Sequence, residues 1–188
     1  MQVIAETLPA LQKLKETGLV RYIGITGLPL KIFKYILDRV EPGVVNAVLS
    51  YCHYSLNDSS LESVVPYLES KGVGIINASL LSMGLLTEQG PPAWHPAPHE
   101  VKAACRRAAE YAQAHGSNIS QLAIKWALQN ESITSHLIGF SKPQQVYDNV
   151  ETVMTALTAD EKKVLDEVLK ILAPVHNTTW PSGRPENN

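Results

Sequence analysis

The sequence predicts one layered α/β unit with a parallel sheet covered by helices. Apolar residues recur at helical spacing in several segments, and short runs rich in β-branched and aromatic residues lie between them. The two kinds of segment alternate along the 188 residues. The short runs show no apolar–polar alternation and are separated by helices, which indicates a parallel sheet covered on the outside. No low-complexity tract or interdomain linker interrupts the pattern.

The chain is expected to open with a helix, a strand and a second helix. Leucines recur at helical spacing from Leu8, and Gly18 stands where a left-handed C-cap is expected. Residues 21–26 are rich in β-branched and aromatic residues and predict a short buried strand. Pro29 suits the first turn of a helix, which is expected to end near Arg39.

The next segment repeats the strand–helix unit and ends in a long loop. Residues 44–49 predict a second strand, and the apolar positions after Leu61 predict a third helix that Gly72 closes. Residues 73–78 predict a third strand. Residues 87–98 contain four prolines, which no regular element accepts, so this stretch predicts an irregular loop.

Two helices, one strand and two further helices are expected after that loop. The first helix covers residues 99–115, the second begins near Asn118, and residues 134–138 predict the fourth strand. Ser141 and Thr158 each stand three residues before a Gln or Glu, which is the spacing of a capping box. We therefore expect these two residues to begin the last two helices.

Composition and charge exclude several classes of protein. Sixteen basic and eighteen acidic residues give a net charge of -2, which leaves no electrostatic footprint for a nucleic-acid or anionic-membrane partner. No window approaches the roughly 18 apolar residues of a membrane span. The first residues lack the basic leader and apolar run of a signal peptide, so a cytoplasmic protein is expected. Cys52 and Cys105 show no motif spacing and are expected to be reduced thiols.

Four segments, in the correct order, resemble motifs of the aldo-keto reductases. They are residues 11–26 (LQKLKETGLVRYIGIT), 74–86 (GIINASLLSMGLL), 117–128 (SNISQLAIKWAL) and 138–149 (IGFSKPQQVYDN). Members of this family are (β/α)8 TIM barrels, and such a barrel takes about 250 residues. The resemblance implies that residues 1–173 are the second half of a barrel, with strands five to eight in parallel and helices outside. Residues 174–188 are polar and predict a loosely held C-terminal tail.

The resemblance also implies an oxidoreductase that uses NAD in preference to NADP. Residues 26–30 (TGLPL) and 49–55 (LSYCHYS) replace the commoner family versions and resemble the plant branch that oxidises L-galactose at C1 to the lactone. The family's catalytic Asp, Tyr, Lys and His lie on the first half of the barrel, and none has a counterpart in these 188 residues. This chain is therefore expected to carry the cofactor-binding half and to have no activity by itself.

The same motifs imply a cradle for the dinucleotide. The matching residues are Thr26, Ser79, Leu81, Met83, Gly84, Gly139, Ser141, Gln145, Asp148 and Asn149. A helix N-terminus, such as the one expected at Ser141, suits phosphate because free N–H groups and the positive end of the helix dipole point at it. Each residue also has a structural explanation. Ser141 can cap the helix, Ser79 can bond within its own loop, Gly139 can permit a tight strand exit, and Asn149 can be solvated.

Two departures from the family pattern affect the expected contacts with the nicotinamide ring. Gly27 stands where the family has an amide side chain, and Ala78 stands where it has a stacking aromatic, whereas Thr26 keeps a hydroxyl. At the adenosine side, Lys142 would suit the 2′-phosphate of NADP, and Asp148 would suit the free 2′-hydroxyl of NAD.

Histidine and tryptophan supply the candidates for a substrate pocket. His53 follows a predicted strand and is expected to line the site, while its neighbour Cys52 is expected to pack, because adjacent strand residues point to opposite faces. Trp94 lies in the predicted loop and either closes over a ligand or anchors the loop. His95 and His99 have the spacing of a helical metal pair, but the prolines between them preclude a helix, so no metal site is expected.

Alternative interpretations remain at this point. The chain could be a shortened, non-catalytic product that binds a partner, or an incomplete gene model or splice form. Half a barrel would leave two unpaired parallel edges, at residues 21–26 and 134–138, which favour self-association. In the complete enzyme, a small sugar would be the partner.

Overall fold

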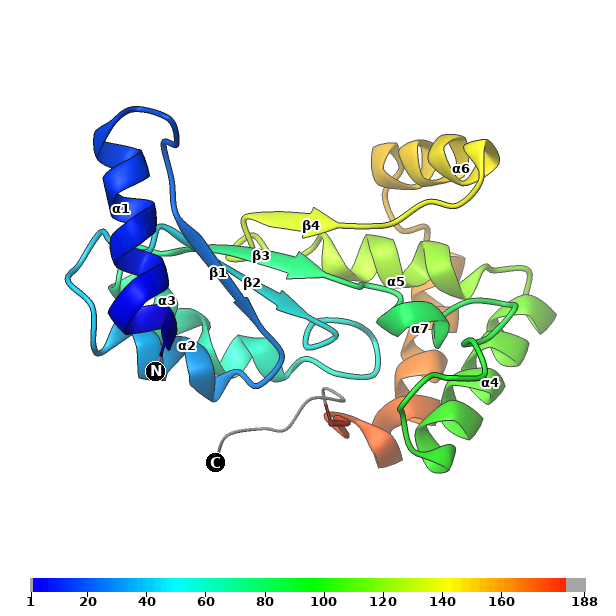
Figure 1. Ribbon diagram of the computed structural model, residues 1–188. Helices are drawn as coiled ribbons and strands as arrows, with labels where there is room; N and C mark the ends of the chain where they lie inside the picture. The colour runs from blue at the N-terminus through cyan, green and yellow to red at the C-terminus, as the bar shows by residue number, and fades with distance from the viewer. Residues whose placement is uncertain (1, 182–188) are drawn as a thin grey trace.

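A four-stranded parallel sheet organises the chain, as the sequence predicts. The computed structural model describes residues 2–181. The strands are β1 (Gly24–Gly27), β2 (Ala47–Tyr51), β3 (Gly74–Ala78) and β4 (Ser135–Leu137), in the sheet order β1-β2-β3-β4 (Figure 1). Every neighbouring pair is parallel. The α/β class with a parallel sheet and flanking helices is therefore confirmed.

Seven α-helices and four shorter helical turns connect and flank the strands in the described part of the chain. They are η1 (Val3–Thr7), α1 (Leu8–Glu16), α2 (Lys31–Leu37), η2 (Ser60–Val64), α3 (Val65–Ser70), η3 (Ser82–Gly84), α4 (His99–Ala114), α5 (Ile119–Ala127), α6 (Pro143–Met154), α7 (Ala159–Leu172) and η4 (Ala173–Val175). Among residues 2–181, no helix combines the length and apolarity that crossing a membrane requires.

The side chains of β2 and β3 alternate between a buried and a half-buried environment. In β2, Val48 and Ser50 are buried, whereas Ala47, Leu49 and Tyr51 are half-buried. The same alternation occurs in β3. Because neighbouring side chains point to opposite faces, one face of the sheet packs tightly against helices and the other is partly accessible.

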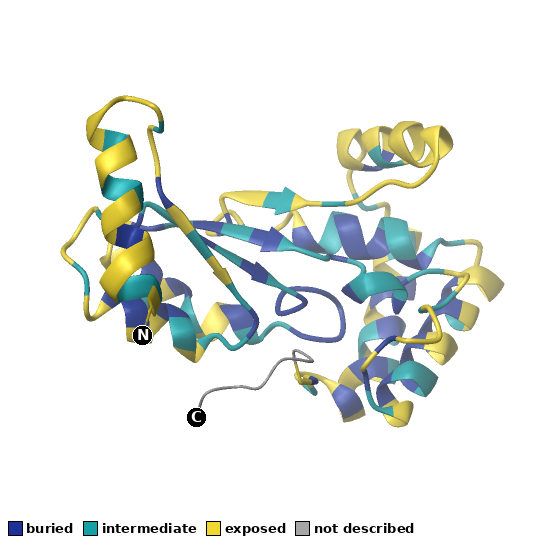
Figure 2. Cartoon of the chain, viewed as in Figure 1, coloured by how far each residue is buried: buried dark blue, intermediate teal, exposed yellow. Residues whose placement is uncertain are grey.

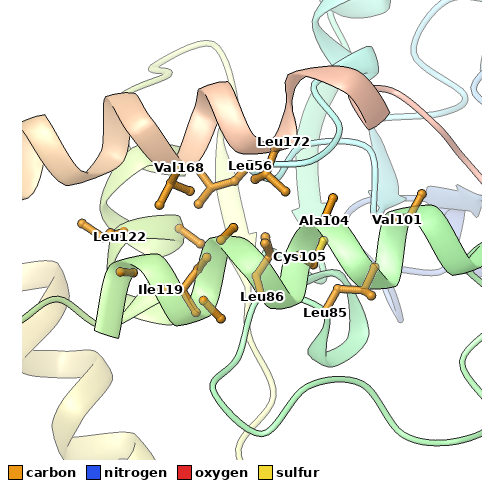
Figure 3. Close-up of a cluster of buried hydrophobic side chains, with 14 of the residues drawn as sticks. Leu56, Leu85, Leu86, Val101, Ala104, Cys105, Ile119, Leu122, Val168 and Leu172 are labelled. Carbon is orange, nitrogen blue, oxygen red and sulfur yellow. The ribbon is translucent and has the colours of Figure 1, made fainter. Parts of the chain in front are cut away.

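Two clusters of buried side chains form the core. One packs the sheet residues Val48 and Ile75 against Phe33 of α2, Leu68 of α3 and Ile124 of α5. The other lies between α4, α5 and α7 and includes residues from the loops that follow β2 and β3. Figure 3 shows the side chains of this second cluster between α7 and α4.

Most predicted helix ends are confirmed by their capping geometry. Gly18 has a φ of 77°, a left-handed conformation that glycine adopts without steric cost. The Asn118 side chain accepts hydrogen bonds from the backbone N–H groups of Ser120 and Gln121. The Thr158 hydroxyl accepts from Glu161 N, and the Glu161 carboxylate accepts from Thr158 N, so the predicted capping box is present.

The strands β1 and β2 begin about three residues later than predicted. Asn46 explains the difference, because its side-chain oxygen accepts a hydrogen bond from Ile23 N at 3.0 Å. The backbone N–H of Asn46 in turn donates to Ile23 O at 2.7 Å. A side chain therefore replaces the regular ladder at this point, although Ile23 and Val45 are buried like strand residues.

The described start of the predicted tail is packed rather than loosely held. Trp180 and Val175 are buried in the second core cluster. The side-chain oxygen of Asn177 accepts from Ser59 N at 2.8 Å, and its backbone N–H donates to Asn57 O at 3.0 Å. These contacts reach across the fold, so local sequence does not reveal them. Residues 182–188 of the predicted tail lie outside the described residues.

Candidate functional site

The carboxyl edge of the sheet brings together the segments that contain most of the predicted site residues. Parallel strands end at the same edge, and in barrels of this type the chemistry lies at that edge. Ala78, the last residue of β3, is in register with Leu137, the last residue of β4. Ser79 and Gly139 therefore leave neighbouring strands at the same end, as the cradle hypothesis requires. Thr26, on β1, lies at the opposite side of the sheet from β4.

Strained backbone marks the loops that follow β2 and β3. Four of the five non-glycine residues with positive φ among residues 2–181 lie there, namely Cys52, Ser79, Ser82 and Met83. Such a conformation costs about 1–3 kcal/mol per residue and persists only where the surroundings impose it. The turns are closed by Ser82 N donating to Ser79 O at 2.8 Å. Two of these residues, Ser79 and Met83, belong to the predicted cradle.

A buried polar cluster holds these two loops together. The Ser55 hydroxyl, the Ser82 hydroxyl and the Asn57 side-chain oxygen lie 2.7–3.1 Å from one another, and all three residues are buried. The Nδ2 atom of Asn57 is buried without a hydrogen-bond partner in the described chain, as is Oγ of Ser50. These residues were not predicted from the sequence, where a polar stretch after a strand looks like an ordinary exposed loop.

His95 ties the proline-rich loop to this cluster and was also missed as a positioning residue. Its Nδ1 accepts a hydrogen bond from Ala97 N at 3.1 Å, so its Nε2 must carry the proton and donate to Ser82 O at 3.0 Å. Burial lowers the pKa of His95, which keeps the ring neutral. The Trp180 ring lies against it with a centroid separation of 5.0 Å. His95 thus fixes the loop after β3 in place.

Trp94 is not the anchor of that loop. Its side chain is 71% exposed, and its ring stacks on the His95 ring at 6.3 Å between centroids. The hypothesis of a hydrophobic anchor at Trp94 is therefore wrong, because His95 and Trp180 take that role from buried positions. The hypothesis that Trp94 covers a ligand stays a prediction.

Cys52 packs as predicted, and it does not form a catalytic pair with His53. Burial raises the pKa of the Cys52 thiol to about 12, so the thiolate nucleophile is not available at neutral pH. His53 is also buried, and its Nδ1 lies 2.8 Å from the backbone oxygen of Tyr51. Its ring is thus bound to the end of β2, close to the carboxyl edge of the sheet.

Packing at the end of β1 explains why glycine stands at position 27, where the family has an amide side chain. A Cβ atom at Gly27 would lie 2.7 Å from Cγ2 of Ile32, so the close approach of α2 requires glycine at this position. Thr26, one residue earlier, is exposed on the opposite face of the strand. It shares that face with Leu49 and Ile76, with which it is aligned in register.

Ser141 does not cap α6, contrary to the prediction. Lys142 is the N-cap residue, and the Gln145 side-chain oxygen accepts three hydrogen bonds at the start of the helix. The donors are Ser141 N at 2.8 Å, Ser141 Oγ at 3.2 Å and Lys142 N at 3.1 Å. Pro143 follows at the first helical position and has no N–H, which shifts the cap by one residue. Three donors thus converge on one oxygen atom.

The remaining cradle residues lie along the start of α6 and in the loop after β3. Gly139 and Asp148 are exposed, Asn149 is half-buried, and the Asp148 carboxylate accepts a hydrogen bond from Gln144 at 2.8 Å. Leu81 and Gly84 are half-buried in the turns after β3, where Gly84 N donates to Leu81 O at 3.0 Å. The structure thus divides the predicted cradle between the loop after β3 and the segment from Gly139 into α6, and it leaves Thr26 apart on β1.

A groove of about 680 Å³ lies beside the loop after β3. None of the predicted cradle residues lines it, although Gly84 lies against Pro91 in its wall. Residues 87–93 form one wall, and α4 forms the other with Lys102, Arg106, Arg107 and Glu110. The Lys102 ammonium group donates to the backbone oxygen of His95, so it also fastens the loop. Among the described residues, no group of three or more His, Cys, Asp or Glu side chains is arranged to hold a metal ion.

Comparison with known proteins agrees with the geometry. The model of the Aldo/keto reductase family matches residues 2–170. The chain is 54% identical to L-galactose dehydrogenase of Arabidopsis thaliana, over 99% of this chain and 59% of that protein. It is 28% identical to D-arabinose 1-dehydrogenase of Saccharomyces cerevisiae, over 97% of this chain and 59% of that protein. The chain therefore spans about three fifths of the length of these relatives.

Solved structures show the same fold. An aldo-keto reductase from Bacillus halodurans superimposes with a TM-score of 0.65 at 23% identity, covering 95% of this chain and 58% of that one. A glycerol dehydrogenase from Gluconobacter oxydans superimposes with a TM-score of 0.61 at 22% identity, covering 96% and 57%. The family match extends over most of the sequence, and the sheet order and the carboxyl-edge loops fit the fold. This chain belongs to the aldo/keto reductase family.

Proposed function

We propose that this chain supplies the NAD-binding half of an aldo-keto reductase that oxidises L-galactose at C1 to the lactone. The observation that carries the proposal is the 54% identity to the Arabidopsis L-galactose dehydrogenase over 99% of this chain. The fold supports the proposal as well. The strained loop at Ser79 follows β3 and the segment that leads to α6 follows β4, so both begin at the same edge of the sheet.

The residues at this edge fit a dinucleotide. Three donors from Ser141 and Lys142 converge on the Gln145 oxygen, and a phosphate or ribose oxygen that displaces this side chain would meet the same donors. Asp148 is exposed in the second turn of α6 and offers a carboxylate to a ribose hydroxyl. When bound, NAD would supply the hydride-accepting chemistry. The Thr26 hydroxyl would hold the carboxamide, and Ser79 with Gly84 would hold the pyrophosphate.

The proton-transfer group of the reaction is not expected among these residues. Cys52 is held protonated by burial, and the ring nitrogens of His95 both have partners in the described chain. We therefore expect this chain to bind and orient the cofactor without turning over the sugar. A general acid or base must reach the reacting hydroxyl directly or through one water, and His53 is buried.

Titration of the purified chain with NAD and with NADP tests the proposal. We expect binding of both with a preference for NAD, and we expect Asp148→Lys to shift the preference toward NADP by adding a cation for the 2′-phosphate. Asp160→Lys is the matched control, because Asp160 is an exposed acid on α7, away from the cradle. The absence of any dinucleotide binding at millimolar concentration would overturn the proposal, as would an equal shift from the control.

Measurement of NADH formation with L-galactose tests the second part of the proposal. Sustained turnover by the 188-residue chain would contradict the assignment of the proton donor to residues outside it. In a longer form of the protein that turns over substrate, kcat/KM for L-galactose, D-arabinose and D-galactose measures the choice of substrate.

A further inference from the structure

The loop that follows β2 is buried over residues 52–58, although it contains histidine, serine, asparagine and aspartate side chains. Figure 2 shows this loop in dark blue beyond the end of β2. Loops normally run over the surface, because their backbone groups need hydrogen-bond partners. In this loop the protein supplies the partners: Leu61 N donates to His53 O at 2.9 Å, and Asn177 N donates to Asn57 O at 3.0 Å. The loop therefore forms a firm support for its neighbours.

The turn after β3 contains three successive residues with positive φ. The angles are 46° at Ser82, 53° at Met83 and 100° at Gly84. Glycine adopts such angles without steric cost, whereas serine and methionine do so only where neighbouring groups hold them. Leu81, just before the three, has a φ of -93° and a ψ of 14°. A residue near the right-handed region followed by a left-handed one turns successive backbone N–H groups toward one side, an arrangement that binds anions.

Two N–H groups of this turn are available to such an anion. Ser82 N donates to Ser79 O and Gly84 N donates to Leu81 O, so these two groups are used within the turn. Among residues 2–181, no backbone acceptor pairs with the N–H groups of Leu81 and Met83. Both residues are half-buried, so a ligand can reach the turn.

Asn57 connects the buried loop to the strained turn through Ser82. Its side-chain oxygen accepts hydrogen bonds from Ser82 Oγ at 2.7 Å and from Ser55 Oγ at 3.1 Å. All three residues are 0% exposed, so solvent does not compete for these bonds. Ser82 O accepts from His95 Nε2 at 3.0 Å, which holds the same residue on its carbonyl side. Loss of the bond to Asn57 would leave the positive φ of Ser82 without its support.

We propose that Asn57 and Ser82 are positioning residues for the dinucleotide. They hold the turn after β3 in the conformation that presents Leu81 N and Met83 N to a phosphate group. The inference rests on the proposed function, which assigns the pyrophosphate to this turn. Because both side chains are fully buried, they act on the cofactor through the backbone and not by contact. The affinity for NAD therefore depends on a carboxamide that follows a different strand from the turn that it holds.

Two substitutions at Ser82 separate support of the backbone from general stability. Ser82→Ala and Ser82→Gly both remove the hydroxyl, but only Ala keeps a Cβ atom and with it the cost of a positive φ. We expect Ser82→Ala to raise the Kd for NAD about tenfold, and we expect Ser82→Gly to raise it about threefold or less. Titration of each folded variant with NAD measures both values. A glycine variant that binds NAD as weakly as the alanine variant would contradict this reasoning.

Substitution of Asn57 tests the other end of the link. Asn57→Leu removes the acceptor with little change in volume and is expected to raise the Kd several-fold, since Ser82 Oγ keeps the Ser55 hydroxyl as a partner at 2.9 Å. In a Ser82→Gly background the same change is expected to have little further effect, because the hydroxyl that Asn57 holds is absent. Val45→Ala is the matched control. Val45 is buried and precedes β2, at the opposite end of the strand from the loop. It is expected to lower stability and leave the Kd unchanged.

Hydrogen exchange follows the turn in the absence of cofactor. Gly84 N and Leu86 N donate to Leu81 O at 3.0 and 3.2 Å, and both are expected to exchange faster in Ser82→Ala than in Val45→Ala. Unchanged exchange, or unchanged affinity of Ser82→Ala and Asn57→Leu in a chain that binds NAD, would overturn this inference alone. An equal rise in Kd from Val45→Ala would also overturn it. An unmodified chain that binds no NAD would overturn the proposed function and, with it, the role assigned to these residues.

Discussion

Replacement of His95 by Phe removes the link between the proline-rich loop and the turn at Ser82. The ring is 3% exposed and makes two hydrogen bonds, to Ser82 O at 3.0 Å and from Ala97 N at 3.1 Å. Phe preserves the shape and the contact with Trp180 but leaves the buried N–H of Ala97 unpaired. It also removes one of the two hydrogen bonds that Ser82 O accepts, the other coming from Leu85 N at 3.2 Å. An unpaired buried N–H costs about 1–3 kcal/mol and a lost hydrogen bond about 1 kcal/mol, so we expect a loss of about 2–4 kcal/mol in the free energy of unfolding.

Urea unfolding of His95→Phe, His95→Gln and the unmodified chain measures this effect. Gln can still donate to Ser82 O from a position close to that of Nε2, so His95→Gln is expected to recover part of the loss. A Phe variant within about 0.5 kcal/mol of the unmodified chain would refute the reasoning. Equal losses from Phe and Gln would show that volume, rather than hydrogen bonding, sets the cost.

The pH dependence of stability gives an independent check on His95. Burial lowers the pKa of His95 below its ordinary value of 6.5, so protons bind the unfolded chain more readily. Its contribution to stability is therefore complete above pH 6.5 and is lost as the pH falls through the lowered pKa. Burial also lowers the pKa of His136, so His136 contributes to the loss of stability at acid pH as well. His95→Phe is therefore expected to remove only part of the acid sensitivity. Unfolding free energy that rises on acidification below pH 6.5 would contradict this assignment.

Two further predictions concern buried positions. Gly27→Ala is expected to cost about 1–3 kcal/mol in urea unfolding, since its Cβ would lie 2.7 Å from Cγ2 of Ile32. In an Ile32→Ala background, which lacks that methyl group, the same substitution is expected to cost less. Cys52 and Cys105 are expected to resist a thiol reagent at pH 8 until the chain unfolds, because burial raises the pKa of each thiol to about 12. Rapid labelling of the native chain would contradict that expectation.

Local rules accounted for most of the secondary structure. Apolar spacing predicted the helices, and Gly18 and Thr158 marked helix ends through their own backbone and side-chain chemistry. Pro66 shows the limit of such rules, because it has no N–H and the predicted third helix divides into η2 and α3 around it. The cap at Ser141 failed for a related reason, since Pro143 moved the helix start by one residue.

The sequence predicted where the candidate site lies but not which residues hold its loops in place. Motif order placed Ser79 and Gly139 at the ends of neighbouring strands, and the register of β3 with β4 agrees. The supporting roles of Asn57 and His95 were missed because each depends on Ser82, which is 25 and 13 residues away in the chain. Nothing in the local sequence of either residue indicates which distant atom it will meet.

The sequence by itself determined the alternation of helices and strands, the parallel sheet and the family. These follow from residue spacing, from turn chemistry and from motifs that read in order. Tertiary structure decided which residues are neutral, strained or exposed: the tautomer of His95, the left-handed backbone of Ser82, and the exposed valines of α6. Those properties depend on neighbours that are distant in the chain. The protonated nitrogen of His95 and the exposure of the α6 valines are therefore defined only once the chain has folded.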